Sequence, residues 1–231
     1  MLGNPVETFF GSLINGPRDM TAFDRGDEAS LFATNVLNGT VAANGTVVNQ
    51  GTVVRINLGV SAKAMPWIES MTVVGSGFAE RTDTTALVIG PTGVGLSPNC
   101  SSSDPDACAA GWRSWGEPVL YVADTLNNRV AVISHAIARN DSAGIGDTLT
   151  TGGSLNAPLG LIVTEGGHIL TVNGGDGFIT EITLQEAQVA KRLLDNSGTP
   201  RGSGALFGLI FEPGRGVIFV DDDTNALNLL H

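Results

Sequence analysis

The sequence predicts an all-β protein built from four copies of one unit of about four strands. The first observation is a strand–turn–strand stretch, 120–133, in which two apolar runs flank the polar turn 124–129. The second is its recurrence at 169–182 without a gap and at 218–230 with one residue deleted, while 31–40 matches its first half. The third is the composition, because 31 glycines and only 15% charged residues suit many short strands joined by tight turns.

The spacing of the copies favours one all-β architecture over the others. Asn173 follows Asp124 by 49 residues, Asp222 follows Asn173 by 49, and Gly208 follows Gly160 by 48. Four-stranded repeats of about 40–50 residues are typical of β-propeller blades. We therefore expect a β-propeller of about four four-stranded blades, either a closed four-blade ring or a partial arc of a six-bladed propeller. A sandwich would have no reason to repeat its turn chemistry at a fixed interval.

The first unit is the least regular copy. It opens at Gly16-Pro17 with a strand to Phe23, and further strands are expected at 31–34, 52–58 and 68–74. Residues 41–51 enlarge the turn after the second strand. We expect no appreciable helix anywhere in the chain.

The later units open with glycine-containing strands, which are expected to be the innermost strands of their blades. The predicted blades are 16–75, 76–150, 151–197 and 198–231, in a single domain spanning 1–231. The last blade stops after three strands, so residues 1–15 are expected as an outer or closing strand. The innermost strands are expected near Gly93–Leu96, Gly160–Val163 and Gly208–Phe211.

Two cysteines bear on the cellular compartment. Cys100 and Cys108 flank a polar loop, and a local disulfide between them would indicate an oxidising compartment; two free thiols are the alternative. The N-terminus carries neither the basic nor the apolar region of a signal peptide. An exported disulfide protein and a missing signal peptide agree if this chain lacks the start of its parent. We therefore expect the full-length parent protein to be secreted or periplasmic, with a signal peptide that this chain lacks.

The composition argues against nucleic acid and membrane insertion. The net charge is −11, and no cluster of Lys and Arg occurs that could follow a phosphate backbone, so nucleic acid is not an expected partner. No apolar run approaches the roughly 18 residues of a membrane span, so no membrane insertion is expected.

The second unit carries a specific motif, Tyr121-Val-Ala-Asp-Thr-Leu-Asn-Asn-Arg129, after an opening Pro91-Thr-Gly93. This pattern resembles the NHL repeat, and nearly the whole chain is similar to bacterial NHL-repeat proteins of unassigned function. The third unit departs from the pattern by having Asn173 and no Arg, and the fourth lacks the Pro. The resemblance implies a propeller that is usually six-bladed, and so a homo-oligomer if this ring is incomplete.

One polar side chain follows the second strand of each unit. These residues are expected on one face as a binding rim: Asn35, Asp124, Asn173 and Asp222, with Asp223 beside the last. Their oxygens could bind Ca²⁺, with Asp222 and Asp223 as the candidate ligands. Alternatively, each side chain caps its own turn, and Asp124 is then expected to accept hydrogen bonds from backbone N–H groups of residues 126–128.

Catalytic residues cannot be assigned from the sequence. His135, His168 and His231 are the only imidazoles, and none lies in a recognised catalytic motif. Two hypotheses remain open. The first is a binding module for a protein, peptide or glycan ligand; the alternative is a metal-assisted lactone or ester hydrolase or lyase of the six-bladed propeller type.

Overall fold

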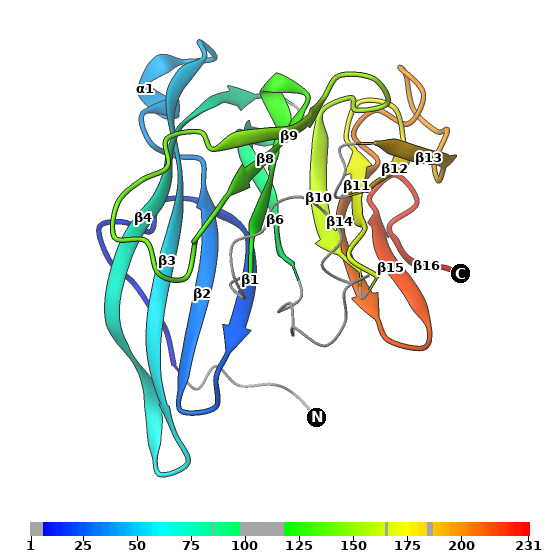
Figure 1. The fold of residues 1–231 in the computed structure, drawn as a ribbon. Helices are drawn as coiled ribbons and strands as arrows, with labels where there is room; N and C mark the ends of the chain where they lie inside the picture. The colour runs from blue at the N-terminus through cyan, green and yellow to red at the C-terminus, as the bar shows by residue number, and fades with distance from the viewer. Residues whose placement is uncertain (1–6, 85, 98–117, 165, 184–186) are drawn as a thin grey trace.

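The chain folds as a β-propeller in which four antiparallel sheets are arranged around a common axis (Figure 1). The structure is a computed structural model that describes residues 7–84, 86–97, 118–164, 166–183 and 187–231. Each sheet is a meander, so strands that are consecutive in the sequence are neighbours in the sheet. The fold class predicted from the repeat is therefore confirmed.

The first sheet contains five strands, and the second contains four. The first consists of β1 (Pro17–Asp24), β2 (Glu28–Asn35), β3 (Val48–Ser61), β4 (Ala64–Asp83) and β5 (Leu87–Ile89), with the short helix α1 (Thr40–Ala43) between β2 and β3. The second consists of β6 (Pro91–Leu96), β7 (Leu120–Asp124), β8 (Arg129–Ile133) and β9 (Asp147–Thr151), with the 3-10 turn η1 (Thr125–Asn127) between β7 and β8.

The third sheet contains four strands, and the fourth contains three. The third consists of β10 (Pro158–Val163), β11 (Ile169–Asn173), β12 (Phe178–Ile182) and β13 (Gln188–Leu193). The fourth consists of β14 (Leu206–Glu212), β15 (Gly216–Asp221) and β16 (Ala226–Leu230).

The innermost strands are those expected from the sequence. β6, β10 and β14 contain the three predicted segments, and consecutive innermost strands pack on one another from β1 to β6, β10 and β14. The described residues show no comparable packing between β14 and β1. The four sheets therefore surround an axis with a loose seam between the last sheet and the first.

The first sheet is larger than the sequence predicted. β4 runs to Asp83, past the expected boundary at residue 75, because β3 begins at Val48 and pairs with Glu80 of the lengthened strand. The short helix α1 forms the start of the enlarged turn predicted at 41–51, and β3 already begins at Val48 within it.

Three apolar layers of the core lie at the junctions between consecutive sheets, and a further cluster lies on the outer face of the first sheet. In β7, Leu120 and Val122 face the first sheet, whereas Tyr121 and Ala123 face the third. The alternation follows from the pleat of a strand, and β7 is apolar from Leu120 to Ala123 because both of its faces are covered. Val172, Leu206 and Phe219 belong to the layer between the third and fourth sheets.

The N-terminal segment does not add a strand to the last sheet. Described residues 7–15 form no strand, and Phe9, Leu13 and Ile14 pack against the cluster of Val54, Ile56 and Leu58. The outer or closing strand expected within 1–15 is therefore not seen in this part of the chain. This N-terminal segment directly precedes β1 in the chain, and it covers the apolar outer face of the first sheet instead of extending the fourth.

Two further expectations concern the cysteines and insertion into a membrane. Cys100 and Cys108, with their expected disulfide, lie outside the described residues. Among the residues that are described, no helix is long and apolar enough to cross a membrane.

Candidate functional site

The predicted rim residues end the second strand of each sheet. Each faces the first residue of its innermost strand, and the register pairs are Pro17 with Asn35, Pro91 with Asp124, Pro158 with Asn173, and Leu206 with Asp221. The fourth member is thus Asp221, and the assignment of Asp222 was wrong by one residue. The turn after Asp221 has the same length as the turns after Asp124 and Asn173, so the units align without the deletion placed in the fourth.

Asp124 is committed to a structural ion pair. It is fully buried, and its carboxylate accepts hydrogen bonds from Arg129 Nε at 3.0 Å and from Asn127 Nδ2 at 3.0 and 3.1 Å, with Arg129 Nη2 at 2.9 Å. No hydrogen bond from the backbone of the turn to this carboxylate is found among the described residues. The expected backbone cap is therefore replaced by two side chains, which neutralise Asp124 and fix the β7–β8 turn.

The other rim residues also make local hydrogen bonds, although the buried Oδ1 of Asn173 has no partner among the described residues. Asn35 Oδ1 accepts a hydrogen bond from the backbone N–H of Asn15 at 2.9 Å. Asn173 Nδ2 donates to the backbone oxygen of Ser154 at 2.7 Å, and Asp221 Oδ1 accepts from the N–H of Thr224 at 3.1 Å.

Asp222 and Asp223 are exposed beyond the end of β15. The Ser197 hydroxyl lies 2.5 Å from Asp223 Oδ2, so this carboxylate already has a local partner.

The rim does not fit a shared calcium ion. Ca²⁺ requires six to eight oxygen ligands with lone pairs directed at the ion. The carboxylate of Asp124 is already paired with a cation, and the oxygen of Asn35 already accepts a hydrogen bond. Within the described ranges, no group of three or more His, Cys, Asp or Glu side chains could hold a metal ion.

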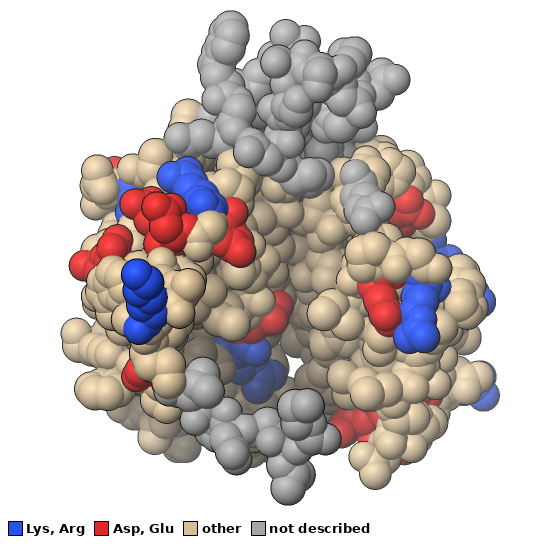
Figure 2. Space-filling model, turned by 90° about the horizontal axis from the view of Figure 1, so that it is seen from below, with Lys and Arg blue, Asp and Glu red and all other residues tan. Residues whose placement is uncertain are grey.

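A central channel is the better candidate site. It has a volume of about 270 Å³ and is lined by equivalent positions on the four innermost strands: Arg18, Asp19, Thr92, Gly93, Leu159, Gly160, Phe207, Gly208 and Leu209. Figure 2 shows the molecule hollowed near its centre, with acidic and basic atoms beside the hollow. Because each strand contributes its second and third residues, the repeat itself builds this cavity.

Asp19 stands where the other innermost strands have glycine. Counted from the paired residue that opens each strand, it is equivalent to Gly93, Gly160 and Gly208. A Cβ atom on Gly93 would lie 2.3 Å from the backbone oxygen of Leu159, so that junction admits no side chain. Sequence reasoning missed Asp19, although comparing the third residue of each innermost strand would have singled it out.

The carboxylate of Asp19 is held in place by the backbone. Its Oδ2 accepts a hydrogen bond from the N–H of Val94 at 3.0 Å, and its Oδ1 accepts from the N–H of Met20 at 2.8 Å. Burial raises the pKa of Asp19, although these two hydrogen bonds oppose the increase. A carboxylate has about four lone-pair sites, so two remain for a ligand.

Buried threonines connect the innermost strands behind the channel. Thr34 Oγ1 accepts from the N–H of Asp19 at 3.2 Å and donates to the backbone oxygen of Thr92 at 2.7 Å. The hydroxyls of Thr92 and Thr125 lie 2.7 Å apart, and Thr125 donates to the backbone oxygen of Pro158 at 2.7 Å. These bonds hold the strands that carry Asp19 in a fixed relation.

Arg18 supplies positive charge at the same place. It precedes Asp19 on β1, its side chain is exposed, and it makes no hydrogen bond or ion pair within the described part of the chain. A guanidinium group presents a planar fork of N–H donors that suits carboxylate and carbonyl oxygens. The channel therefore combines a free cation with a carboxylate whose pKa is raised.

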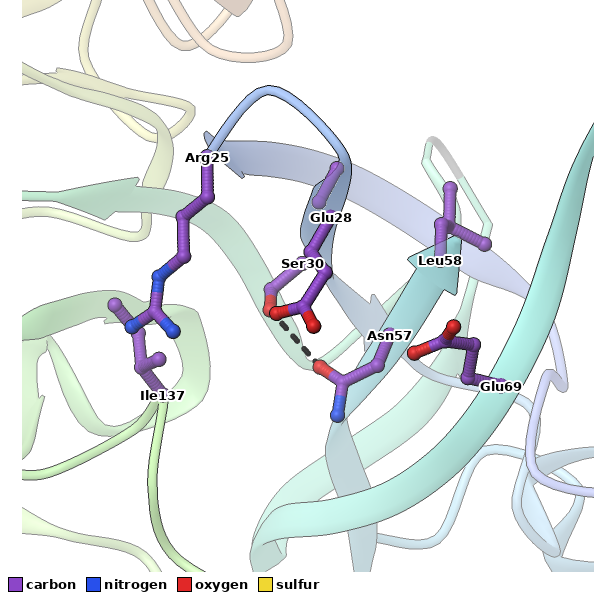
Figure 3. Close-up of a pocket in the computed structure, with 8 residues that line it drawn as sticks. Arg25, Glu28, Ser30, Asn57, Leu58, Glu69 and Ile137 are labelled. Carbon is purple, nitrogen blue, oxygen red and sulfur yellow. Dashed lines mark hydrogen bonds between the residues drawn. The ribbon is translucent and has the colours of Figure 1, made fainter. Parts of the chain in front are cut away.

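A second, smaller pocket lies between the first sheet and Ile137 (Figure 3). It has a volume of about 90 Å³ and is bordered by Arg25, Glu28 and Glu69, while Ser30 donates to Asn57 Oδ1 at 2.9 Å beside it. This volume is one third of that of the central channel, and it lies far below the roughly 300–1,000 Å³ of ligand pockets, which the channel approaches. We therefore take the central channel as the candidate site.

Comparisons with known proteins support the fold. No protein-family profile matches the chain, and no curated protein matches its sequence. Among solved structures, a candidate gluconolactonase superposes with a TM-score of 0.52 at 18% identity, over 96% of this chain and 60% of that chain.

Two further solved structures show a weaker likeness. They are a calcium-binding regucalcin from Agrobacterium tumefaciens (TM-score 0.45, 14% identity, 87% of this chain, 57% of that chain) and a streptogramin B lyase (TM-score 0.45, 13% identity, 94% of this chain, 66% of that chain). The chain thus spans between 57% and 66% of the length of these three structures. At such identities the likeness shows the fold alone, and the NHL-repeat resemblance stays a prediction.

Proposed function

We propose that the chain binds a small lactone or ester in its central channel and opens it by hydrolysis. The observation that carries this proposal is Asp19. Its carboxylate has a raised pKa, and it stands at the position of β1 at which the other innermost strands have glycine. The name of one structure of similar fold, a candidate gluconolactonase, suggests a lactone as the substrate class.

The two charged residues suit the two halves of an acyl-transfer reaction. Arg18 would donate to the carbonyl oxygen of the substrate and stabilise the negative charge that develops there. Asp19 would take a proton from a water molecule as its oxygen attacks the acyl carbon. The acyl C–O bond then breaks, and the proton passes from Asp19 to the leaving oxygen, which gives a hydroxy acid.

The proposal assigns no step to a metal ion. Of the rim oxygens predicted to bind Ca²⁺, Asn35 Oδ1 accepts a hydrogen bond from the backbone of Asn15, and the Asp124 carboxylate is paired with Arg129. The hydrolase hypothesis therefore rests here on Arg18 and Asp19, and the role of calcium is left to measurement.

A binding module for a protein, peptide or glycan is the second candidate function. The observation that favours it is the exposed apolar surface of the fourth sheet, which includes Ile210, Leu227 and Leu229. A pure binding module would retain its ligand without changing it.

Hydrolysis of a substrate panel tests the proposal. Sugar-acid δ-lactones and aryl esters would be incubated with the purified chain, with added calcium and with a chelator, and acid release would be followed by pH indicator. We expect release above the spontaneous rate, and the same rate with the chelator. Binding of a lactone without acid release would contradict hydrolysis but keep the channel as a binding site, and neither binding nor release would contradict the proposed use of the channel altogether.

A further inference from the structure

The fourth sheet exposes positions that are buried at every earlier junction. In the register of the sheets, Val220 is equivalent to Ala123 and Val172, which are both 0% exposed, yet Val220 is 38% exposed. The same relation holds on the next strand.

Leu227 is equivalent to Val130 and Ile179 on the preceding sheets. Those two side chains are 0% and 4% exposed, because the following sheet covers them, whereas Leu227 is 74% exposed. Leu227 therefore occupies a junction position without a covering sheet in the described chain.

The glycines of the innermost strands show the same break in the series. A Cβ on Gly93 or Gly160 would meet the backbone oxygen of Leu159 or Phe207 on the following innermost strand, at 2.3 and 2.4 Å. A Cβ on Gly208 would meet only a methyl group of Val220, at 3.9 Å. The position beside Gly208 is thus open among the described residues, where the equivalent positions are closed by the backbone of the next strand.

The uncovered surface is almost free of charge. Strand alternation and pairing place its members on one face of the sheet: Ile210, Ile218, Val220, Leu227 and Leu229. Glu212 lies at one end of this face and is paired with Arg215 at 3.4 Å. Contiguous exposed apolar surface of this kind marks an interaction site.

The opposite end of the arc is already covered. The outer face of the first sheet, with Val54 and Ile56, is packed against Phe9, Leu13 and Ile14 of the same chain. A head-to-tail contact, in which the fourth sheet of one copy meets the first sheet of another, would have to displace that segment. Among the described residues, the fourth sheet is therefore the end of the series that is free to receive a second sheet.

We propose that two copies of this chain associate through the faces of their fourth sheets as a two-fold symmetric dimer. An uncharged apolar face is self-complementary, because two copies bury it without desolvating a charge. Each copy carries a net charge of −11, so the copies repel one another at long range. Salt screens this repulsion, and the dimer should become tighter as ionic strength rises.

Sedimentation equilibrium of the full chain tests this dimer. We expect a monomer–dimer equilibrium whose dissociation constant decreases with added NaCl. Leu227→Lys should increase that constant at least tenfold, since it places a charge in the apolar contact. Val41→Lys is the matched control, because Val41 is 72% exposed on α1, away from the fourth sheet, and it should leave the constant unchanged.

Two results would overturn the dimer. One is a wild-type chain that stays monomeric at high micromolar concentration in high salt. The other is a Leu227→Lys variant that folds, as judged by its circular dichroism and melting temperature, and dimerises as well as the wild type. Neither result bears on hydrolysis in the channel, so this inference and the proposed function fail separately.

Discussion

The Asp19 carboxylate accepts a hydrogen bond from the backbone N–H of Val94 at 3.0 Å and thereby joins the innermost strands of the first two sheets. The next two junctions are made by glycines, with the backbone of the following strand directly against Gly93 and Gly160. The first junction thus carries an ionisable side chain where the next two have direct backbone contact. This difference supplies the carboxylate of the candidate site.

The glycine junctions predict an unequal response to one added methyl group. Gly93→Ala and Gly160→Ala should each lower the free energy of unfolding by about 3 kcal/mol, because the new Cβ would collide with a backbone oxygen that cannot move aside. Gly208→Ala should change it by less than about 1 kcal/mol, since its position is open. Urea unfolding at low protein concentration measures all three, and equal losses would show that the fourth position is not open.

The buried ion pair predicts a large loss when only one partner is removed. Asp124→Ala leaves the buried guanidinium of Arg129 without its carboxylate and should cost about 3–5 kcal/mol in thermal or urea unfolding. The double variant Asp124→Leu/Arg129→Met should cost less than Asp124→Ala alone, because no charge is left buried. Asp222→Ala, at an exposed site, is the control. A loss below about 1 kcal/mol for Asp124→Ala would contradict the structural role assigned to the pair.

Glu80 predicts a pH dependence of stability. It is fully buried in β4, and neither carboxylate oxygen has a hydrogen-bond partner of good geometry among the described residues. Burial raises the pKa of Glu80 to about 7, and the nearby backbone N–H of Asn38 opposes this as the smaller effect. Between the ordinary pKa of 4.5 and the raised value, the folded chain binds a proton that the unfolded chain has lost.

Stability from Glu80 is therefore complete below about pH 4.5 and falls by up to about 1.4 kcal/mol per pH unit as the pH rises towards 7. We expect the melting temperature to decrease between pH 5 and 8 in the wild type. Glu80→Gln should remove most of this decrease, because an amide does not titrate. An identical decrease in both proteins would assign the pH dependence to other groups.

Calcium provides a separate test of the rim. Because Asp124 and Asn35 already have partners, Ca²⁺ should leave the melting temperature of the wild type and of Asp222→Asn unchanged. A specific site filled at 100 times its dissociation constant would instead stabilise the fold by about 2.7 kcal/mol. A calcium-dependent increase that is lost in Asp222→Asn would restore the predicted metal site.

The sequence predicted those features that repeat. Strand alternation and a period of 48–49 residues located the innermost strands and three of the four rim positions, because each depends on local pattern. The assignment of Asp222 failed because a strand pair can be aligned with one residue shifted at little apparent cost, and only the pairing of Leu206 with Asp221 settles it.

Features that depend on the departure of one unit from the others were not predicted. Asp19 was overlooked because its significance lies in the contact with Val94 on another sheet, 75 residues away. The uncovered face of the fourth sheet was likewise hidden, since Leu227 has the same apolar character as Val130, and only their exposure differs.

The most direct test of the proposed site is the pH–rate profile of lactone hydrolysis by the wild type, Asp19→Asn and Asp222→Asn. We expect the wild-type rate to rise with pH through a pKa above the ordinary 3.8 of aspartate, because Asp19 must be ionised to accept a proton. Asp19→Asn should lose this rise and at least about a hundredfold in rate while remaining folded, and Asp222→Asn should match the wild type. Equal rates in Asp19→Asn and the wild type would contradict the assignment of the channel as a hydrolytic site.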